Sequence, residues 1–308
     1  MNELSRPEIA RPLMLIGLLL LAAGVRVWAS IARRAARGEP VIAYEPRKPV
    51  PWGALDVLLV VLYFVVTSGW IASVDAVLFH VPREPPPGVV DAAPDASHPL
   101  VVLMRYDRSL AGLALCLASG VLAAPIAEEI LFRLLFQGWL EAVERRWRRR
   151  WPALRRSVRG LVPVLITSSA FALLHFREAM PAVNPRWLLH ALVRGMAANL
   201  LTVGFAVALV HDRVGATAAD LGFSRARFWS DVRLGLLAFL AVAVPVYLLQ
   251  FVLSAVLPGR LAPDPITMIF FALVLGLLYH RTHRIVPSIA LHTALNATSL
   301  AVLVWLLH

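Results

Sequence analysis

The sequence predicts an all-α, polytopic transmembrane helix bundle of about eight spans. Of its 308 residues, 59% are hydrophobic and only 16% are charged, whereas a soluble domain is usually ~45–50% apolar and about 25% charged. The apolar residues gather in runs, most of which approach the ~20 residues that a helix needs to cross a bilayer. Backbone polar groups must be paired internally in lipid, so these runs are expected to be helices. The composition argues against a water-soluble enzyme, a disordered tail and a fibrous repeat.

The expected spans follow one another along the whole chain. The first is expected to be an uncleaved span, because the segment before it contains Glu3 and Glu8 and is not clearly basic. The fourth and seventh runs are short, and we expect them to be extended by neighbours, tilted or partly inserted. The proline-rich stretch 81–107 is predicted to be an irregular extramembrane loop. The runs are 12–30, 52–80, 109–139, 161–176, 187–211, 232–257, 266–280 and 285–307.

The order of the runs predicts two parts of the chain. Residues 1–107 would form two spans and the proline-rich loop. Residues 108–308 would form the second part, with an inserted helical segment near 187–257. The single cysteine, Cys116, lies inside an apolar run. Disulfides, a cysteine-ligated metal and an iron–sulfur cluster within one chain are therefore excluded.

The net charge of +11 is explained by the expected topology. The loops after the first, third, fifth and seventh spans carry 19 basic residues, and the opposite side carries 8. The positive-inside rule places the more basic loops in the cytoplasm and both termini outside. Basic loops also bind anionic lipid, so membrane lipid is an expected partner and nucleic acid is not. We expect a multi-pass protein of a bacterial inner (cytoplasmic) membrane.

The third span contains three ionisable residues, Glu128, Glu129 and Arg133. An ionisable side chain at mid-bilayer costs ~2.5–3.5 kcal/mol, so it indicates function unless it has a partner. Glu129 and Arg133 are four residues apart and share a helix face, so Arg133 can neutralise and orient Glu129. Glu128 points about 100° away and is left to face a cavity, where it suits a general base acting on water. The alternative is a structural Glu129–Arg133 ion pair that locks two helices.

Two histidines in other spans add to this set. His175 follows Phe171 by four residues, and His292 precedes Asn296 by four. A lone membrane histidine is more typical of a hydrogen-bonded packing residue. Together, however, Glu128, His175, His292 and Asn296 could bind a tetrahedral metal with an open position. They could equally hold a water for attack and donate hydrogen bonds to an oxyanion, and spacing does not separate these alternatives.

Depth in the bilayer gives a rough check on this constellation. Glu128 lies about 14 Å from the cytoplasmic end of its span, and His292 lies about 10 Å from the start of its own. His175 lies about 21 Å along the fourth span by the same rule. It would be too far outward unless that helix begins later, tilts or breaks. His280 and His283 stand beside arginines at the end of the seventh span and are predicted to be interfacial.

The ordered motifs resemble those of the CPBP intramembrane proteases, which include type II CAAX prenyl endopeptidases and bacteriocin-immunity relatives. The resemblance covers about 108–176 and 270–300, and the run 276–292 resembles the family's last helical pair. His190 is a rival for the second-motif histidine, because 117 positions separate His175 from His292. The motifs are Glu128-Glu129-x-x-x-Arg133, Phe171-x-x-x-His175 and His292-x-x-x-Asn296.

The resemblance implies an intramembrane endopeptidase domain within 108–308. Glu128 would activate the hydrolytic water, and Glu129 and Arg133 would shape the site. His175, His292 and Asn296 would position water or stabilise the oxyanion. The implied substrate is a membrane-associated protein or lipidated peptide, cut in prenyl-protein processing after a lipidated cysteine.

Two other functions and one cofactor question stay open. In a non-catalytic membrane scaffold or immunity protein, the motif residues would hold the helices together and would not catalyse a reaction. An ion-coupled transporter would use Glu128 and Glu129 as a relay, although no inverted repeat is evident. We expect no obligatory cofactor. A divalent metal such as zinc, held by the Glu128, His175, His292 and Asn296 set, is the alternative.

Overall fold

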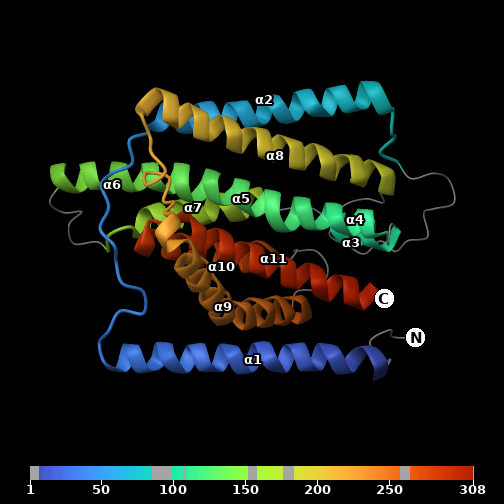
Figure 1. The fold of residues 1–308 in the computed structure, drawn as a ribbon, viewed down its shortest axis with the longest axis horizontal. Helices are drawn as coiled ribbons and strands as arrows, with labels where there is room; N and C mark the ends of the chain where they lie inside the picture. The colour runs from blue at the N-terminus through green and yellow to red at the C-terminus, as the bar shows by residue number, and fades with distance from the viewer. Residues whose placement is uncertain are drawn as a thin grey trace.

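The computed structural model describes residues 7–84, 99–106, 109–151, 158–175, 184–256 and 264–307, and the regular elements in these ranges are all helical (Figure 1). The predicted all-α bundle is confirmed. The longer helices lie roughly parallel or antiparallel to one another. They are α1 Pro7–Ala36, α2 Ala54–Phe79, α7 Leu161–Leu174, α8 Pro185–Val214, α9 Phe228–Val256, α10 Asp264–Thr282, α11 Ile285–Leu307 and the segmented helix 110–150.

Several helices are long and apolar enough to cross a membrane. Five helical stretches in the described residues meet this requirement, and Leu161–Leu174 and Ile266–Thr282 are shorter apolar helices. Apolar side chains also point outward, as on α2, where Leu58, Val65 and Trp70 are 61%, 59% and 65% exposed. An apolar surface of this extent is stable against lipid rather than water. The chain is an integral membrane protein, and the count of about eight spans stays a prediction.

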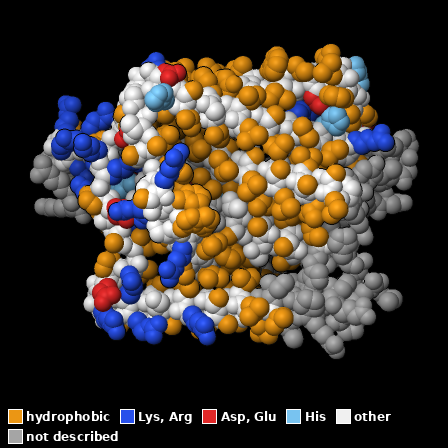
Figure 2. All heavy atoms as spheres, viewed as in Figure 1, with side chains coloured by type: hydrophobic (Ala, Val, Ile, Leu, Met, Phe, Trp, Pro, Cys, Tyr) orange, Lys and Arg blue, Asp and Glu red, His pale blue; other side chains and the backbone are white. Residues whose placement is uncertain are grey.

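The charged side chains gather at one end of the bundle. In Figure 2 most lysine and arginine side chains lie at the left and lower left, while apolar side chains cover much of the middle. Figure 1 places the end of α6 (Gly138–Arg150) on this side, and Arg148, Arg149 and Arg150 form its last turn. We call this the basic end. Helix α1 begins and α11 ends at the opposite end, as expected if both termini lie on one side of the membrane (Figure 1).

The prediction of an irregular loop over 81–107 is wrong for its last part. Residues 85–98 and 107 lie outside the described residues, but Pro99–Tyr106 forms the short helix α3. Proline fits the first turn of a helix because its missing N–H would have no partner there. Leu103 and Met104 are buried, in a cluster with Cys116 and Leu300. The apolar run after Pro99 therefore folds onto the bundle.

The third predicted span is a helix whose winding changes along its length. It consists of α4 Leu110–Cys116, the π-helix η2 Leu117–Ala123, α5 Ala124–Glu128, the π-helix η3 Glu129–Gln137 and α6. Pro125 lacks the N–H that would bond the Val121 carbonyl in an α-helix, which accounts for wider winding before it. Wide turns of this kind are frequent at functional sites. Glu128 and Glu129 occupy the junction of α5 and η3.

Helices α9 and α11 approach closely at Gly235. A Cβ atom at this residue would lie 2.5 Å from the Pro287 carbonyl oxygen and 2.6 Å from the Ala290 Cβ. Gly235→Ala is therefore expected to lower the free energy of unfolding by about 1–3 kcal/mol through overpacking. Thermal unfolding of the purified protein in detergent measures the loss. Gly204→Ala on α8 is the matched control, because a Cβ there meets no atom within 4 Å; equal effects of the two substitutions would contradict the prediction.

Candidate active site

Three helices distant in sequence converge on the carboxylate of Glu128. The His175 Nε2 lies 3.6 Å and the His292 Nε2 lies 3.7 Å from the same oxygen, Oε2. Glu128 ends α5, His175 follows the last residue of α7, and His292 lies on α11. These distances exceed a direct hydrogen bond and are in the range where a water can bridge polar groups. The side chains of Glu128 and His175 are 24% and 30% exposed and that of His292 is 5% exposed, so the group is open on the side of Glu128 and His175.

Each imidazole is oriented by its other nitrogen. The His175 Nδ1 donates to the Phe171 carbonyl at 2.7 Å, and the His292 Nδ1 donates to Glu129 Oε1 at 3.0 Å. A carbonyl and an ionised carboxylate accept but do not donate, so the proton is on Nδ1 in both rings. The Nε2 atoms therefore face Glu128. The Phe171-x-x-x-His175 spacing matters through this backbone contact and through stacking of the two rings, whose centroids are 4.2 Å apart.

The predicted Glu129–Arg133 pair is present and fully buried. The Arg133 Nε lies 3.5 Å from Glu129 Oε2, and both side chains are 0% exposed. The Arg133 guanidinium also lies 5.1 Å from the centroid of the Phe171 ring. The pair belongs to one helix, but it contacts α7 through Phe171 and α11 through His292. It forms the buried wall behind Glu128, and the expected division between a buried and an accessible carboxylate agrees with the burial of the two residues.

Asn296 lies one helical turn beyond His292 and contacts the backbone of η2. Its Nδ2 donates to the Gly120 carbonyl at 2.9 Å. Wide winding leaves carbonyls without their usual α-helical partner, so a side-chain amide can satisfy one of them. This bond ties α11 to η2 and fixes the height of His292 beside Glu128. The contact favours a positioning role for Asn296.

His175 lies level with Glu128, and not too far outward as its distance along the fourth span predicted, because α7 and the segmented helix do not start at a common level. Helix α7 begins at Leu161 as expected. The Gly160 N–H, however, bonds Glu144 Oε2 at 2.9 Å, and the Thr167 Oγ1 lies 3.4 Å from Gln137 Oε1. Leu161 therefore lies beside α6, nearer the basic end than Gln137. The first turns of α7 run alongside α6, and only the following turns lie beside η3. His175 arrives at Glu128 without any break in the helix.

Two further predictions about histidines are resolved by their partners. His190 bonds Asp75 at 2.7 Å and Arg194 bonds the same carboxylate at 2.6 Å, so His190 joins α8 to α2 outside the Glu128 site. His280 and His283, predicted to be interfacial, are at the basic end of the bundle but are buried within the protein, at 7% and 5% exposed. Both contact Glu141, which the sequence analysis missed because it lies beyond the expected third span. The neighbouring arginines made these histidines look superficial, although their spacing from each other could have suggested a shared partner.

The donor set at Glu128 fits a metal by chemistry. One carboxylate and two imidazoles are ligands that zinc accepts. Among the described acidic and histidine residues, however, the group whose ligand atoms all lie within 4.8 Å of one another is Glu141, His280 and His283. The Glu128 set is more open than that group.

Comparison with known proteins gives one match. A model of the family described as type II CAAX prenyl endopeptidase Rce1-like matches residues 110–298. This range includes Glu128, His175, His292 and Asn296, together with α5, α7 and the first part of α11. No curated protein and no solved structure matches the chain.

Proposed function

This chain belongs to the type II CAAX prenyl endopeptidase Rce1-like family, and from that membership we propose that it hydrolyses a peptide bond with a water activated by Glu128. Membership of this family means that the chain is an intramembrane CAAX-type endopeptidase, a hydrolase whose substrate is a membrane-associated protein or peptide. One observation carries the finer proposal. The Nε2 atoms of His175 and His292 approach a single oxygen of an accessible carboxylate.

The chemical steps follow from this arrangement. The Glu128 carboxylate takes one proton of a bound water, while an imidazole Nε2 accepts a hydrogen bond from the other proton. The water oxygen attacks the carbonyl carbon and forms a tetrahedral intermediate. The protonated Glu128 returns its proton to the amide nitrogen as the C–N bond breaks, which releases an amine and a carboxylic acid; the acid then gives its proton to the amine. Glu129 keeps His292 in the required tautomer, and Arg133 balances the charge of Glu129.

The reaction in this proposal needs no obligatory metal at Glu128. Cleavage is therefore expected to survive treatment with a strong chelator, measured at a temperature where the treated protein stays folded. A zinc-dependent reaction would instead use Glu128, His175 and His292 as ligands, with zinc polarising the water. The opposite outcome is tested in a variant with His280 and His283 both replaced by glutamine. If this variant stays folded, loses cleavage on chelation and recovers it on adding zinc, the metal-free reaction is contradicted.

The substrate class is tested with the purified protein in liposomes. A peptide ending in a farnesylated cysteine and three further residues is expected to lose its C-terminal tripeptide, which mass spectrometry detects. The same peptide with an unmodified cysteine tests whether the lipid is required. Trapping with a Glu128→Ala variant in native membranes then identifies natural substrates. Release of the tripeptide at the same rate by the Glu128→Ala protein would overturn the assignment.

A further inference from the structure

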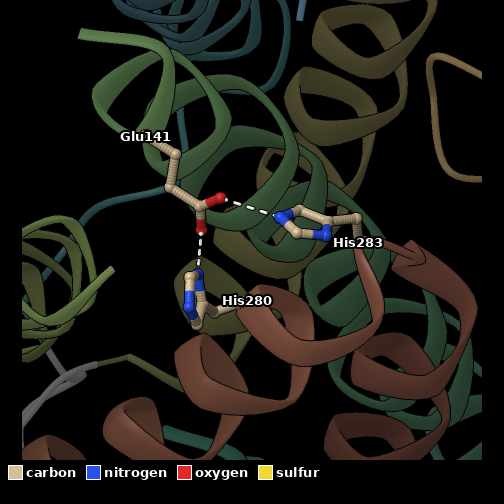
Figure 3. A group of neighbouring side chains, drawn as sticks. All are labelled: Glu141, His280 and His283. Carbon is tan, nitrogen blue, oxygen red and sulfur yellow. Dashed lines mark hydrogen bonds and ion pairs between the residues drawn. The ribbon is translucent and has the colours of Figure 1, made fainter. Parts of the chain in front are cut away.

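A second cluster of ionisable side chains is buried at the basic end of the bundle. Figure 3 shows the imidazoles of His280 and His283 pointing at the two oxygens of one carboxylate, Glu141. The Glu141 Oε1 lies 3.1 Å from the His280 Nδ1, and its Oε2 lies 2.9 Å from the His283 Nε2. Glu141 comes from α6, His280 from the last turn of α10 and His283 from the turn before α11. This group shares no residue with the Glu128 site.

The hydrogen bonds around the cluster orient a lone pair toward the carboxylate. The His283 Nδ1 donates to the Glu45 carbonyl at 2.8 Å. A protonated ring donates from Nε2 to Glu141 Oε2, whereas the neutral ring presents an Nε2 lone pair at the same place, which a cation can bind. A histidine that donates one N–H to a backbone carbonyl and presents the other nitrogen is the usual arrangement of a metal ligand. Gln137 donates to Glu141 Oε1 at 3.1 Å and so fixes the carboxylate as well.

We propose that Glu141, His280 and His283 bind a divalent transition-metal ion, zinc by ligand type, at a site separate from Glu128. Their ligand atoms all lie within 4.8 Å of one another. Around tetrahedral zinc, ligand atoms at about 2.0–2.2 Å from the metal are roughly 3.3–3.5 Å apart. Glu141 would bind through one of its oxygens, and the contact of that oxygen with its imidazole, 3.1 Å at Oε1 or 2.9 Å at Oε2, would need to open by only a few tenths of an ångström. Two imidazoles and a carboxylate leave a fourth position for water.

A pocket leads to the Glu141, His280 and His283 cluster, and a glycine packs closely against one of its imidazoles. A pocket of about 320 Å³ lined by Tyr44, Leu161 and Leu277 reaches His280. Gly160, with φ +77°, lies against the His280 ring, where a Cβ atom would be 2.1 Å from Cε1. Only glycine combines this backbone conformation with so close an approach.

The turn that carries His283 is itself held in an uncommon conformation. His283 has φ +50°, which a non-glycine residue adopts at some energetic expense. Tyr44 contacts both imidazoles, with ring centroids 5.5 and 5.6 Å away. Together with the Glu45 carbonyl, these contacts connect segment 37–52 to the cluster. A bound ion would therefore join α6, α10 and this segment, which indicates a structural role at the basic end.

Metal titration of the full-length protein in detergent tests the proposal. After chelation, the wild-type protein is expected to bind one Zn²⁺ per chain at this site and to unfold at a higher temperature with zinc than without. The double variant His280→Gln/His283→Gln should lose at least about 100-fold in affinity, because changing only a group that hydrogen-bonds a metal ligand typically costs 10–100-fold. His190→Gln is the matched control, since His190 also bonds a carboxylate but lies between α8 and α2; it should bind zinc as the wild type does.

A second variant separates this site from the Glu128 site and does not rest on the proposed function. His175→Gln/His292→Gln removes the imidazoles near Glu128, so zinc bound by that protein must use other ligands. X-ray absorption of its zinc-loaded form is expected to show two imidazole nitrogens. Absence of zinc binding by this variant would overturn the proposal, as would equal affinity in the wild type and in a folded His280→Gln/His283→Gln protein. If the His280→Gln/His283→Gln protein does not fold, the X-ray absorption spectrum of the zinc-loaded His175→Gln/His292→Gln protein still tests the proposal.

Discussion

Replacing Glu128 with glutamine is expected to lower the rate of peptide-bond cleavage by roughly a hundred- to ten-thousandfold. Glutamine has nearly the shape of glutamate but cannot take a proton from water. The Glu128 side chain is 24% exposed, and the imidazoles 3.6 and 3.7 Å away are held by Phe171 and Glu129. The fold should therefore tolerate the change. The measurements are tripeptide release from a farnesylated peptide in liposomes and thermal unfolding of the same preparation.

Glu144→Gln is the matched control for this substitution. Glu144 lies further along the same long helix, and glutamine keeps an oxygen that can accept from the Gly160 N–H, so cleavage should stay close to the wild-type rate. Unchanged turnover in Glu128→Gln would reject Glu128 as the base. The double change His175→Ala/His292→Ala addresses the scaffold alternative. If biological activity survives this change, the motif residues hold the helices together and do not form a catalytic centre.

Replacing Arg133 with methionine is expected to destabilise the protein by roughly 3–5 kcal/mol. Arg133 and Glu129 are both 0% exposed, and their charged groups are 3.5 Å apart. Methionine fills much of the space but leaves the Glu129 carboxylate buried without its cationic partner. The packing of the guanidinium against the Phe171 ring, at 5.1 Å, is lost as well. The loss should appear as a lower unfolding temperature in detergent, measured by scanning fluorimetry or calorimetry.

The pair Glu129→Gln/Arg133→Met shows whether an unpaired charge causes the loss. Removing both charges should recover most of the stability, because a buried ion pair is often replaceable by neutral groups. Cleavage should stay low in the double variant, since glutamine at position 129 no longer presents a carboxylate to the His292 Nδ1. If Arg133→Met is as stable as the wild type, the pair does not stabilise the wall of the site.

Hydropathy predicted the helical bundle because lipid imposes one requirement on every spanning segment, namely internal pairing of backbone groups. The same reasoning singled out Glu128, Glu129 and Arg133, since charges within apolar runs stand out. It also found the His175 and His292 spacings, which the structure brings to one carboxylate oxygen.

Other features depend on contacts that a linear pattern does not contain. The π-helical winding of η2 depends, besides Pro125, on which carbonyls find partners in other helices, as Gly120 does in Asn296. The depth of His175 depends on how far α7 extends beyond Gln137 toward the basic end. Glu141 stands four residues before a run of arginines in the sequence and is buried because α10 and the turn after it bring His280 and His283 over it. Burial of α3 likewise depends on distant partners such as Leu300.

The wide winding of η3 has a consequence for chain length. A π-helical turn contains one residue more than the α-helical turn that it replaces. Deleting one residue between Glu129 and Gln137 would allow this stretch to rewind tightly while the flanking helices kept their register. Arg133, inside the rewound stretch, would then change its angular position relative to Glu128 and Glu129 at the start of that stretch. A homologue shortened by this single position would insert into the membrane and fold like its parent, yet would not hydrolyse the peptide bond.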